Sequence, residues 1–177
     1  ERRRYVEKIA PQAQEIYRGI SRGKEELSLS YAPSPRLPEG SSQQDWIELF
    51  KTELRRTEAS DVRSGFTSVG PHRDDLEITL GGLSARMYGS QGQQRTAALS
   101  LKLSEIELVK QVAEDTPVLL LDDVLSELDQ NRQNYLLNSI HDIQTLITCT
   151  GLDEFVGHRF SINKVFKVVE GSVYSEN

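Results

Sequence analysis

The segment VLLLDDVLSELD, residues 118–129, decides the predicted fold. Its run of aliphatic residues is typical of a parallel strand that is covered on both faces. Asp122 and Asp123 follow at the carboxyl end of that strand, which is the edge where open α/β sheets bind their ligands. One carboxylate can hold Mg²⁺ through water, and the next can orient or deprotonate an attacking water. The pair therefore indicates phosphoryl-transfer chemistry.

A purely structural interpretation of the same segment is also open. Strands commonly end in polar loops, and Asp129 can be an ordinary N-cap of a helix that we expect over residues 129–141. That interpretation accounts for one aspartate well, but it accounts poorly for two in succession after an aliphatic run. We therefore favour a chemical role for Asp122 and Asp123.

A second motif, Ser90-Gln91-Gly92-Gln93, opens a long helix expected over residues 90–114. Serine at the N-cap and glutamine three residues later form the pattern of a capping box, which explains Ser90 and Gln93 without a ligand. It does not explain Gly92, because glycine inside a first turn costs up to ~1 kcal/mol relative to alanine. A helix N-terminus with a serine hydroxyl is also a natural phosphate site. Both interpretations stay open.

The remaining pattern predicts a mixed α/β fold. The other expected elements are a helix over 1–22 interrupted near Pro11, a strand at 27–31, a proline-rich loop at 33–42, an amphipathic helix at 43–58, strands at 76–80 and 83–87 joined by Gly81-Gly82, a strand at 144–148, and β segments at 165–169 and 173–174. Strand–helix–strand alternation after residue 115 indicates an α/β sheet.

The composition is that of a globular protein. The 177 residues include 21 basic and 27 acidic side chains, for a net charge of −6, and 37% are hydrophobic. No apolar run is long enough to suggest a membrane span, and the N-terminus does not suggest a signal peptide. The single cysteine, Cys149, excludes an internal disulfide and a multi-cysteine metal site, so a reducing cytosol is the default compartment.

Charge and chain start bear on the possible partners. Residues 101–177 hold 6 basic and 13 acidic groups, which disfavours them as a surface for a phosphate backbone. Arg2-Arg3-Arg4 is the better candidate for contact with nucleic acid, although a solvated helix face explains these arginines as well. The chain starts at Glu1 and its one methionine is Met87, so we expect it to be a piece of a longer protein.

The motifs, taken in order, resemble the RecF family of ABC/SMC-like ATPases. The segments that carry the resemblance are SVGPHRDDL at 68–76, GSQGQQRT at 89–96 and LLLDDVLSELD at 119–129. Ser90–Gln93 is similar to the ABC signature, with Gln91 where the usual motif has glycine. Val118–Asp123 is similar to the Walker B strand with its catalytic acid, and Ser126–Asp129 to the D-loop. The resemblance is specific over residues 65–150 and diffuse elsewhere.

The resemblance implies the C-terminal half of an ABC-type (SMC-like) ATPase head. Residues 1–62 would be part of an inserted helical lobe, and residues 63–177 the C-terminal part of the ATPase domain. The implied cofactors are ATP and Mg²⁺, shared between the two protomers of a dimer. The implied roles are Mg²⁺ binding through water for Asp122, polarisation of the attacking water for Asp123, contact with the partner's nucleotide for Ser90, Gln91, Gly92 and Gln93, and the dimer interface for Ser126 and Asp129.

The same resemblance implies a cytoplasmic protein of DNA repair, recombination, replication and the SOS response. Its implied partners are double-stranded DNA and single-strand/duplex junctions, and RecO and RecR, with which it would help to load RecA. No membrane partner is implied. The resemblance itself does not identify the residues that would contact DNA.

Departures from the family pattern shape the expected activity. The phosphate-binding loop G-x-x-x-x-G-K-[ST] is missing from the sequence. The nearest string, Gly19–Glu25, has one residue too few between its two glycines and has glutamate in place of the serine or threonine. We therefore expect this chain alone to be inactive. The complete protein would be a slow ATPase, since Asp123 is shorter than the commoner glutamate. Thr148-Cys149-Thr150 stands where most ABC ATPases place a switch histidine.

Some assignments stay open. His72 lies in the family-like segment and is either structural or functional, whereas His141 and His158 are expected to be surface or packing residues. The alternatives for the whole chain are the head of another ABC/SMC-like ATPase, or a non-catalytic interaction module whose helix cap and acidic strand end only mimic the motifs.

Overall fold

The computed structural model describes residues 1–38, 40–150 and 162–176. The chain divides into two compact units, Glu1–Asp115 and Thr116–Asn177, each described by itself below. The predicted domain boundary between residues 62 and 63 lies inside the first unit and remains a prediction, since a compact unit and a family domain need not coincide. No helix in the described ranges is both long and apolar enough to span a membrane.

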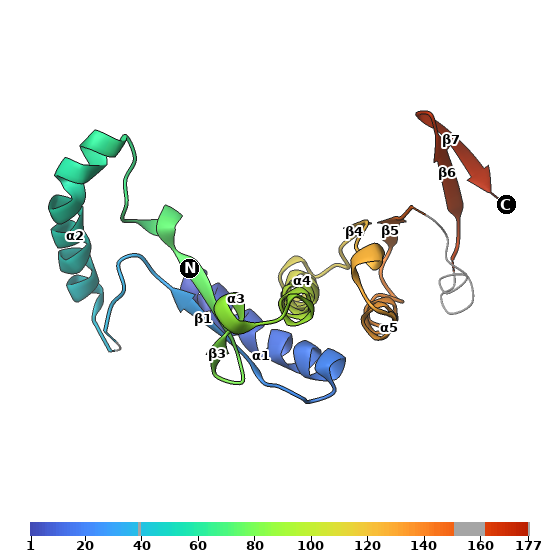
Figure 1. Cartoon of the computed structure of the whole chain (residues 1–177), viewed down its shortest axis with the longest axis horizontal. Coiled ribbons are helices and arrows are strands. Elements are labelled where there is room, and N and C mark those ends of the chain that lie inside the picture. Colours follow the sequence, from blue (N-terminus) through green and yellow to red (C-terminus); the bar gives the residue numbers. More distant parts are fainter. Residues whose placement is uncertain (39, 151–161, 177) are drawn as a thin grey trace. The chain divides into compact units, whose positions relative to one another are not determined.

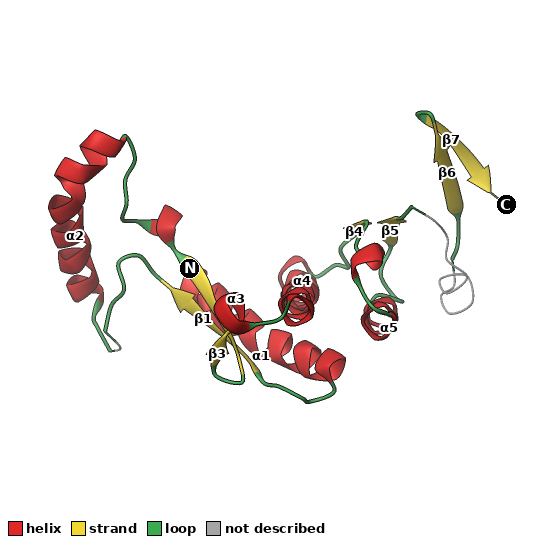
Figure 2. Ribbon diagram, in the orientation of Figure 1, coloured by secondary structure: helices red, strands yellow, loops and turns green. Residues whose placement is uncertain are grey.

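The first unit combines helices with a small antiparallel sheet (Figures 1 and 2). Its elements are α1 (Arg2–Ser21), β1 (Leu27–Ala32), α2 (Gln43–Ser64), a 3-10 turn at Pro71–Arg73, β2 (Asp75–Leu80), β3 (Leu83–Ser84), α3 (Ala85–Tyr88) and α4 (Gln91–Ala113). The strand order is β1-β2-β3, and β1 pairs with β2 from Leu27 opposite Leu80 to Ala32 opposite Asp75. The expected strand at 27–31 and the expected long helix are confirmed.

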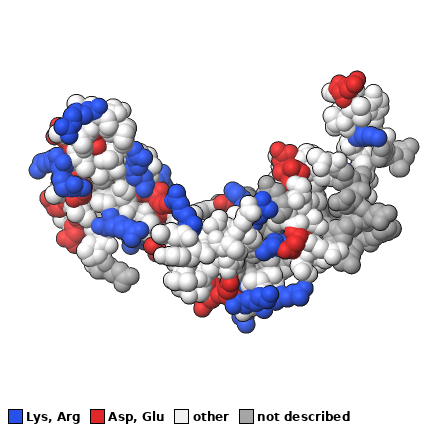
Figure 3. Space-filling view, in the orientation of Figure 1, with Lys and Arg blue, Asp and Glu red and all other residues white. Residues whose placement is uncertain are grey.

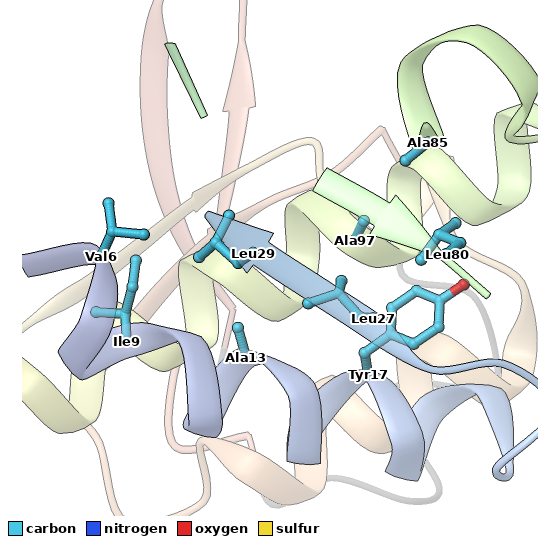
Figure 4. Close-up of a cluster of buried hydrophobic side chains, with 9 residues drawn as sticks. All are labelled: Val6, Ile9, Ala13, Tyr17, Leu27, Leu29, Leu80, Ala85 and Ala97. Carbon is cyan, nitrogen blue, oxygen red and sulfur yellow. The ribbon is translucent and has the colours of Figure 1, made fainter. Parts of the chain in front are cut away.

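The core of the first unit is built on one face of α1. Val6, Ile9, Ala13 and Tyr17 recur every three or four residues along α1 and are all buried. They face buried side chains of the two long strands and of α4 (Figure 4): Leu27, Leu29, Leu80 and Ala97. The first turn of α4, where the predicted signature begins, therefore belongs to a helix anchored in a packed core.

The expected interruption of the first helix near Pro11 is wrong. α1 is continuous from Arg2 to Ser21 with Pro11 inside it. Proline in a helix interior costs about 3 kcal/mol or more, because a hydrogen bond is lost and the ring crowds the preceding turn. Pro11 is exposed, so water can reach the affected turn, and burial of the opposite face of α1 outweighs the cost.

The expected strand at 83–87 is also wrong beyond its first residues. β3 ends at Ser84, and α3 takes the chain through one helical turn. The Gly89 N–H donates to the Ala85 carbonyl at 3.0 Å, and the Gln94 side-chain amide donates to the same carbonyl at 3.0 Å and to that of Gly89 at 3.1 Å. A Cβ on Gly89 would lie 2.4 Å from the Ala85 oxygen, so only glycine fits this turn. The contacts of Gln94, which belongs to α4, hold the chain in this turn in place of the expected strand.

α2 runs to Ser64, beyond the expected end at residue 58. It begins in a capping box between Ser42 and Asp45 and stops only at Gly65, whose φ of 75° is the left-handed conformation that favours glycine. Lys and Arg side chains lie among Asp and Glu over this helix (Figure 3). The mixture gives α2 no continuous basic surface in this view.

The second unit contains two separate pairs of strands. Its elements are β4 (Leu119–Asp122), a 3-10 turn at Leu125–Glu127, α5 (Gln130–Ser139), β5 (Thr145–Thr148), β6 (Val165–Val169) and β7 (Ser172–Glu176). β4 and β5 are parallel, with Asp122 opposite Thr148, while β6 and β7 form an antiparallel hairpin. The parallel strands, the helix between them and the hairpin at Glu170-Gly171 are as expected.

The expectation that the aliphatic strand is covered on both faces is wrong for the described part of the chain. Leu120 is 71% exposed, and its neighbours Val118 and Leu146 are 55% and 54% exposed. Successive side chains of a strand point to opposite faces, so Leu120 of β4 and Leu146 of β5 mark one open face of this two-stranded sheet. The buried hydrophobic residues of this unit belong to the 3-10 turn, to α5 and to the segment that follows α5: Leu125, Leu136, Leu137, Ile140 and Ile143.

Candidate nucleotide site

The start of α4 forms a complete capping box. The Gln93 N–H donates to the Ser90 hydroxyl oxygen at 3.3 Å, and the Ser90 N–H donates to the Gln93 side-chain oxygen at 2.6 Å. The capping pattern in the sequence is therefore real, and it gives Ser90 and Gln93 a structural role.

A carboxylate from a distant turn holds Gln93 in this position. The side-chain amide of Gln93 donates to Glu25 Oε1 at 2.5 Å, while Glu25 Oε2 accepts from the Tyr17 hydroxyl at 3.0 Å. Glu25 thus connects α1 to the first turn of α4. Nothing in the local sequence predicts this contact, because the two residues are 68 positions apart.

Gln91 and Gly92 complete the first turn of α4. The Gly92 carbonyl accepts from the Thr96 hydroxyl at 2.7 Å, and the Thr96 carbonyl in turn accepts from the Ser100 hydroxyl at 2.8 Å. Thr96 and Ser100 are buried, and these bonds along the helix satisfy their hydroxyls. The small polar side chains let α4 lie in the core without leaving these polar groups unpaired.

In the second unit, Asp122 and Asp123 lie at the carboxyl end of β4, as predicted. Both carboxylates are exposed. The Asp123 N–H donates to the Thr148 carbonyl at 3.2 Å and to the Thr148 hydroxyl oxygen at 3.1 Å. The Thr148 hydroxyl donates to Asp122 Oδ1 at 2.5 Å. The end of β5 therefore fixes the two neighbouring aspartates.

Asp123 has a backbone conformation that is rare for a residue with a side chain. Its φ is 50°, in the left-handed region that costs roughly 1–2 kcal/mol for most L-residues and that aspartate tolerates better than most. The Asp123 carbonyl accepts from the Ser126 hydroxyl at 2.8 Å, which braces the turn from the other side. Strained backbone held by its surroundings is a common feature of functional sites.

Asp129 is the N-cap of α5, as its structural interpretation predicts. Its side chain accepts from the Arg132 N–H at 3.0 Å and forms an ion pair with the Arg132 guanidinium. Ser126 and Asp129 thus both have contacts within their own turn. A dimer contact by these two residues remains a prediction.

The residues at the end of β4 fit a magnesium ion that is bound mainly by water and phosphate. One oxygen of Asp122, Oδ1, is engaged by Thr148, and the other takes part in none of these bonds. Within the described residues, no three His, Cys, Asp or Glu side chains gather as a metal cluster. Mg²⁺ does not need such a cluster, since it usually binds one or two carboxylates together with waters and substrate phosphates.

The remaining predicted residues have simple surroundings. A ring nitrogen of His72, Nε2, lies 2.7 Å from the Thr67 carbonyl, and the His72 ring would be 3.2 Å from a Cβ on Gly70, so His72 has structural contacts in its turn. His141 is at the surface, with its Nε2 atom 2.8 Å from Asp142. Cys149 is an exposed free thiol. His158 lies outside the described residues.

The family-like segment at 68–76 also contains a nearly buried carboxylate. The Asp74 side chain is 6% exposed and accepts from Arg2 at 2.8 Å, from the Ser34 N–H at 2.9 Å and from the Tyr31 hydroxyl. Burial raises the pKa of Asp74, whereas the hydrogen bonds from Tyr31, Ser34 and Arg2 lower it. The hydrogen bonds together outweigh the burial, so the pKa lies below its ordinary value. Arg2 is thereby committed to a structural contact.

Comparison with known proteins identifies relatives of the chain. No protein-family profile matches it. "DNA replication and repair protein RecF" of Agathobacter rectalis is 56% identical over 172 residues, which cover 97% of this chain and 45% of that protein. The protein of the same name from Lachnospira eligens is 51% identical over 176 residues, which cover 99% of this chain and 46% of that protein. The chain spans just under half the length of these relatives.

Solved structures agree with the sequence relatives. A structure described as the recombination mediator protein RecF with ATP in the RecFOR pathway matches 99% of the chain with a TM-score of 0.79 and 37% identity, over 45% of its own length. An SMC ATPase structure matches 98% of the chain with a TM-score of 0.55 and 16% identity, which shows a shared fold only. The chain is therefore homologous to RecF along nearly its whole length and has the fold of part of an ABC/SMC-like ATPase head.

Proposed function

We propose that this RecF homologue forms part of an ATP-dependent DNA-binding protein of recombinational repair. In this proposal the chain supplies two parts of that protein's nucleotide site. Asp122 and Asp123 are the first part, and Ser90–Gln93 at the start of α4 are the second. The observation that carries the proposal is the aspartate pair at the end of β4, held by Thr148, in a chain that aligns with the RecF–ATP structure. Such a pair suits phosphoryl transfer.

Each aspartate has a distinct task in this proposal. Asp122 holds Mg²⁺, through water, with the oxygen that Thr148 does not engage. The ion neutralises charge on the nucleotide phosphates when it is bound. Asp123 polarises the attacking water, and its short side chain makes hydrolysis slow. The 177 residues contain no G-x-x-x-x-G-K-[ST] loop, so this chain alone is inactive.

The signature residues act across a dimer in this proposal. Ser90 and Gly92 contact the γ-phosphate of the nucleotide that the opposite protomer holds, and Gln91 and Gln93 shape the same turn. Ser126 and Asp129 lie at the interface. The proposal rests on the family resemblance of these motifs, on the exposed position of Ser90 at the start of a 23-residue helix, and on the positive dipole end there.

The proposed nucleic-acid partners are duplex DNA and single-strand/duplex junctions. The protein works with RecO and RecR to load RecA at gaps, in the cytoplasm and within the SOS response. Homology to RecF supports this assignment. Of the N-terminal arginines, Arg2 is engaged by Asp74, so Arg3 and Arg4 are the better candidates for phosphate contact.

A non-catalytic interaction module is the second candidate. The contacts that favour it are the capping bonds of Ser90 and Gln93 and the N-cap role of Asp129, which account for these residues without any nucleotide. It leaves the exposed aspartate pair and the strained backbone of Asp123 without a reason.

The variant Asp123→Asn separates the two candidates. We expect a full-length RecF-type protein that contains this sequence to keep ATP binding and to lose hydrolysis by about 10²–10⁴-fold, because an amide cannot take a proton. Asparagine also tolerates the left-handed backbone at this position. Phosphate release and equilibrium ATP binding are the measurements, and Asp142→Asn, an exposed carboxylate of the same unit, is the matched control. Unchanged hydrolysis in Asp123→Asn would favour the interaction module.

A further inference from the structure

Thr148 lies at the point where β5 meets the aspartate pair. It is the last residue of β5 and stands directly opposite Asp122 in the parallel register. Two of its oxygen atoms contact the aspartates: the hydroxyl oxygen and the backbone carbonyl oxygen. Thr148 therefore has hydrogen bonds to both aspartates.

The hydroxyl of Thr148 is used as acceptor and donor at once. It accepts from the Asp123 N–H at 3.1 Å and donates its single proton to Asp122 Oδ1 at 2.5 Å. The bonds therefore run in one direction, from the Asp123 amide through the hydroxyl to the Asp122 carboxylate. Hydrogen bonds in such a chain polarise and strengthen one another. The Thr148 carbonyl adds a second acceptor for the Asp123 N–H at 3.2 Å.

We propose that Thr148 is a positioning residue of the nucleotide site, whose hydroxyl orients Asp122 towards Mg²⁺ and whose contacts hold Asp123 in its turn. This inference rests on the proposed function. By engaging Oδ1, the hydroxyl fixes the rotation of the Asp122 carboxylate and presents Oδ2 to the water-bound ion. Partners that orient a metal-binding carboxylate in this way usually set the affinity for the metal.

The side chain of threonine combines the two properties that this role needs. Its branched Cβ restricts χ1 and suits a strand, so the hydroxyl is held in one direction. Valine has the same shape without the hydroxyl, and serine keeps the hydroxyl with a less restricted side chain. The two substitutions therefore separate the hydrogen bonds from the packing.

The test is Mg²⁺-dependent binding of a non-hydrolysable ATP analogue to the full-length RecF-type protein that contains this sequence. In Thr148→Val we expect the Mg²⁺ concentration for half-maximal binding to rise by about tenfold, the lower end of the usual effect of such partners. Binding recovers at saturating Mg²⁺, because Asp122 itself is intact. Thr148→Ser stays within about threefold of wild type, since its hydroxyl can make the same bonds. Thr148→Ala, which adds no apolar volume, behaves as Thr148→Val.

Thr145 provides a matched control on the same strand. It stands at the first position of β5, and its hydroxyl donates to the Ile143 carbonyl at 2.9 Å, away from the aspartates. Thr145→Val should leave the Mg²⁺ dependence unchanged, with thermal unfolding of both valine variants measured in parallel. Wild-type Mg²⁺ dependence in Thr148→Val and Thr148→Ala would overturn the inference, as would equal impairment in Thr148→Ser.

A variant of Asp122 distinguishes failure of this inference from failure of the proposed function. Asp122→Ala should abolish the Mg²⁺ dependence of analogue binding if Asp122 serves the ion. If it does so while the Thr148 variants behave as wild type, the assignment of Thr148 is wrong and the nucleotide site stands. If Asp122→Ala also leaves the Mg²⁺ dependence unchanged, the metal role of Asp122 fails, and the inference about Thr148 fails with it.

Discussion

Asp74 shows how a single carboxylate joins three segments of the first unit. Its partners come from the start of α1, from the end of β1 and from the loop after β1. The pKa of Asp74 is lowered on balance by its hydrogen bonds. The stability it contributes is therefore fully present above the unfolded pKa of about 3.9 and is lost as the pH falls through the lower folded pKa.

We predict that Asp74→Asn lowers the free energy of unfolding at pH 7 by about 1.5–3 kcal/mol, because charge-assisted hydrogen bonds become neutral or are lost. The difference from wild type should shrink as the pH is lowered below 4, where the wild-type carboxyl is itself protonated. Urea unfolding at a series of pH values measures both effects. Asp75→Asn is the control, since that side chain is 70% exposed and pairs only loosely with Arg86 at 3.7 Å, so the expected change is within about 0.5 kcal/mol. A pH-independent difference at Asp74 would contradict the assignment.

Residue-level roles could be predicted from the sequence only where they are local. The N-cap role of Asp129 and the capping box of Ser90 and Gln93 involve residues three apart, so their spacing was sufficient. The contacts of Asp74 with Tyr31 and of Gln93 with Glu25 join residues 43 and 68 positions apart. No local pattern carries that information, because the fold alone brings these segments together.

At the scale of elements, α1 shows burial overriding a local preference. Its buried face continues past Pro11, which therefore remains inside the helix at a local cost. We predict that Pro11→Ala raises the free energy of unfolding by about 2 kcal/mol. Removing proline from the helix interior gains about 3 kcal/mol, but about 1 kcal/mol is lost because the unfolded chain becomes less restricted. Thermal unfolding followed by circular dichroism tests this, with Glu15→Ala at an exposed position of α1 as control. A destabilised Pro11→Ala would show that proline is required there for a bend or a packing contact.

The element predictions succeeded where the periodicity and the terminating residues agree. The strands β1, β2, β4 and β5 and the helix α4 lie within a few residues of their expected bounds. The errors arose where a contact from another element decides the outcome. Gln94 holds the turn at residues 85–89 in helical form, and the aliphatic pattern of β4 does not reveal that one face of its sheet is open in the described part of the chain.

At the scale of the whole molecule, the proposed nucleotide site draws on both units. Ser90 belongs to the first unit, and Asp122 and Asp123 belong to the second. The sequence predicted both motifs because each is local, whereas their combination in one site, as proposed above, would be a property of a dimer. In such a dimer each nucleotide would contact Asp122 of one protomer and Ser90 of the other, so the two residues would act in trans.

Complementation between two inactive variants tests this arrangement. In a full-length RecF-type protein that contains this sequence, Ser90→Arg places bulk and charge at the start of α4 and blocks closure over the γ-phosphate. Asp122→Ala removes the Mg²⁺ ligand. Each homodimer has two damaged sites and should hydrolyse very little ATP. A mixed dimer pairs the intact Asp122 of one variant with the intact Ser90 of the other, which leaves one whole site.

Mixing the two variants should therefore restore DNA-stimulated ATP hydrolysis. With equal amounts and free exchange, half of the dimers are mixed and each has one whole site of two, so activity should approach about a quarter of wild type for a two-fold symmetric dimer. Labelled subunits confirm the exchange. If exchange occurs and no activity returns, the nucleotide stoichiometry of the mixed dimer decides the cause. One bound nucleotide per mixed dimer, against a different number in the homodimers, means that two intact sites must act together. The same stoichiometry in the mixed dimer as in the homodimers means that Ser90 does not act across the dimer.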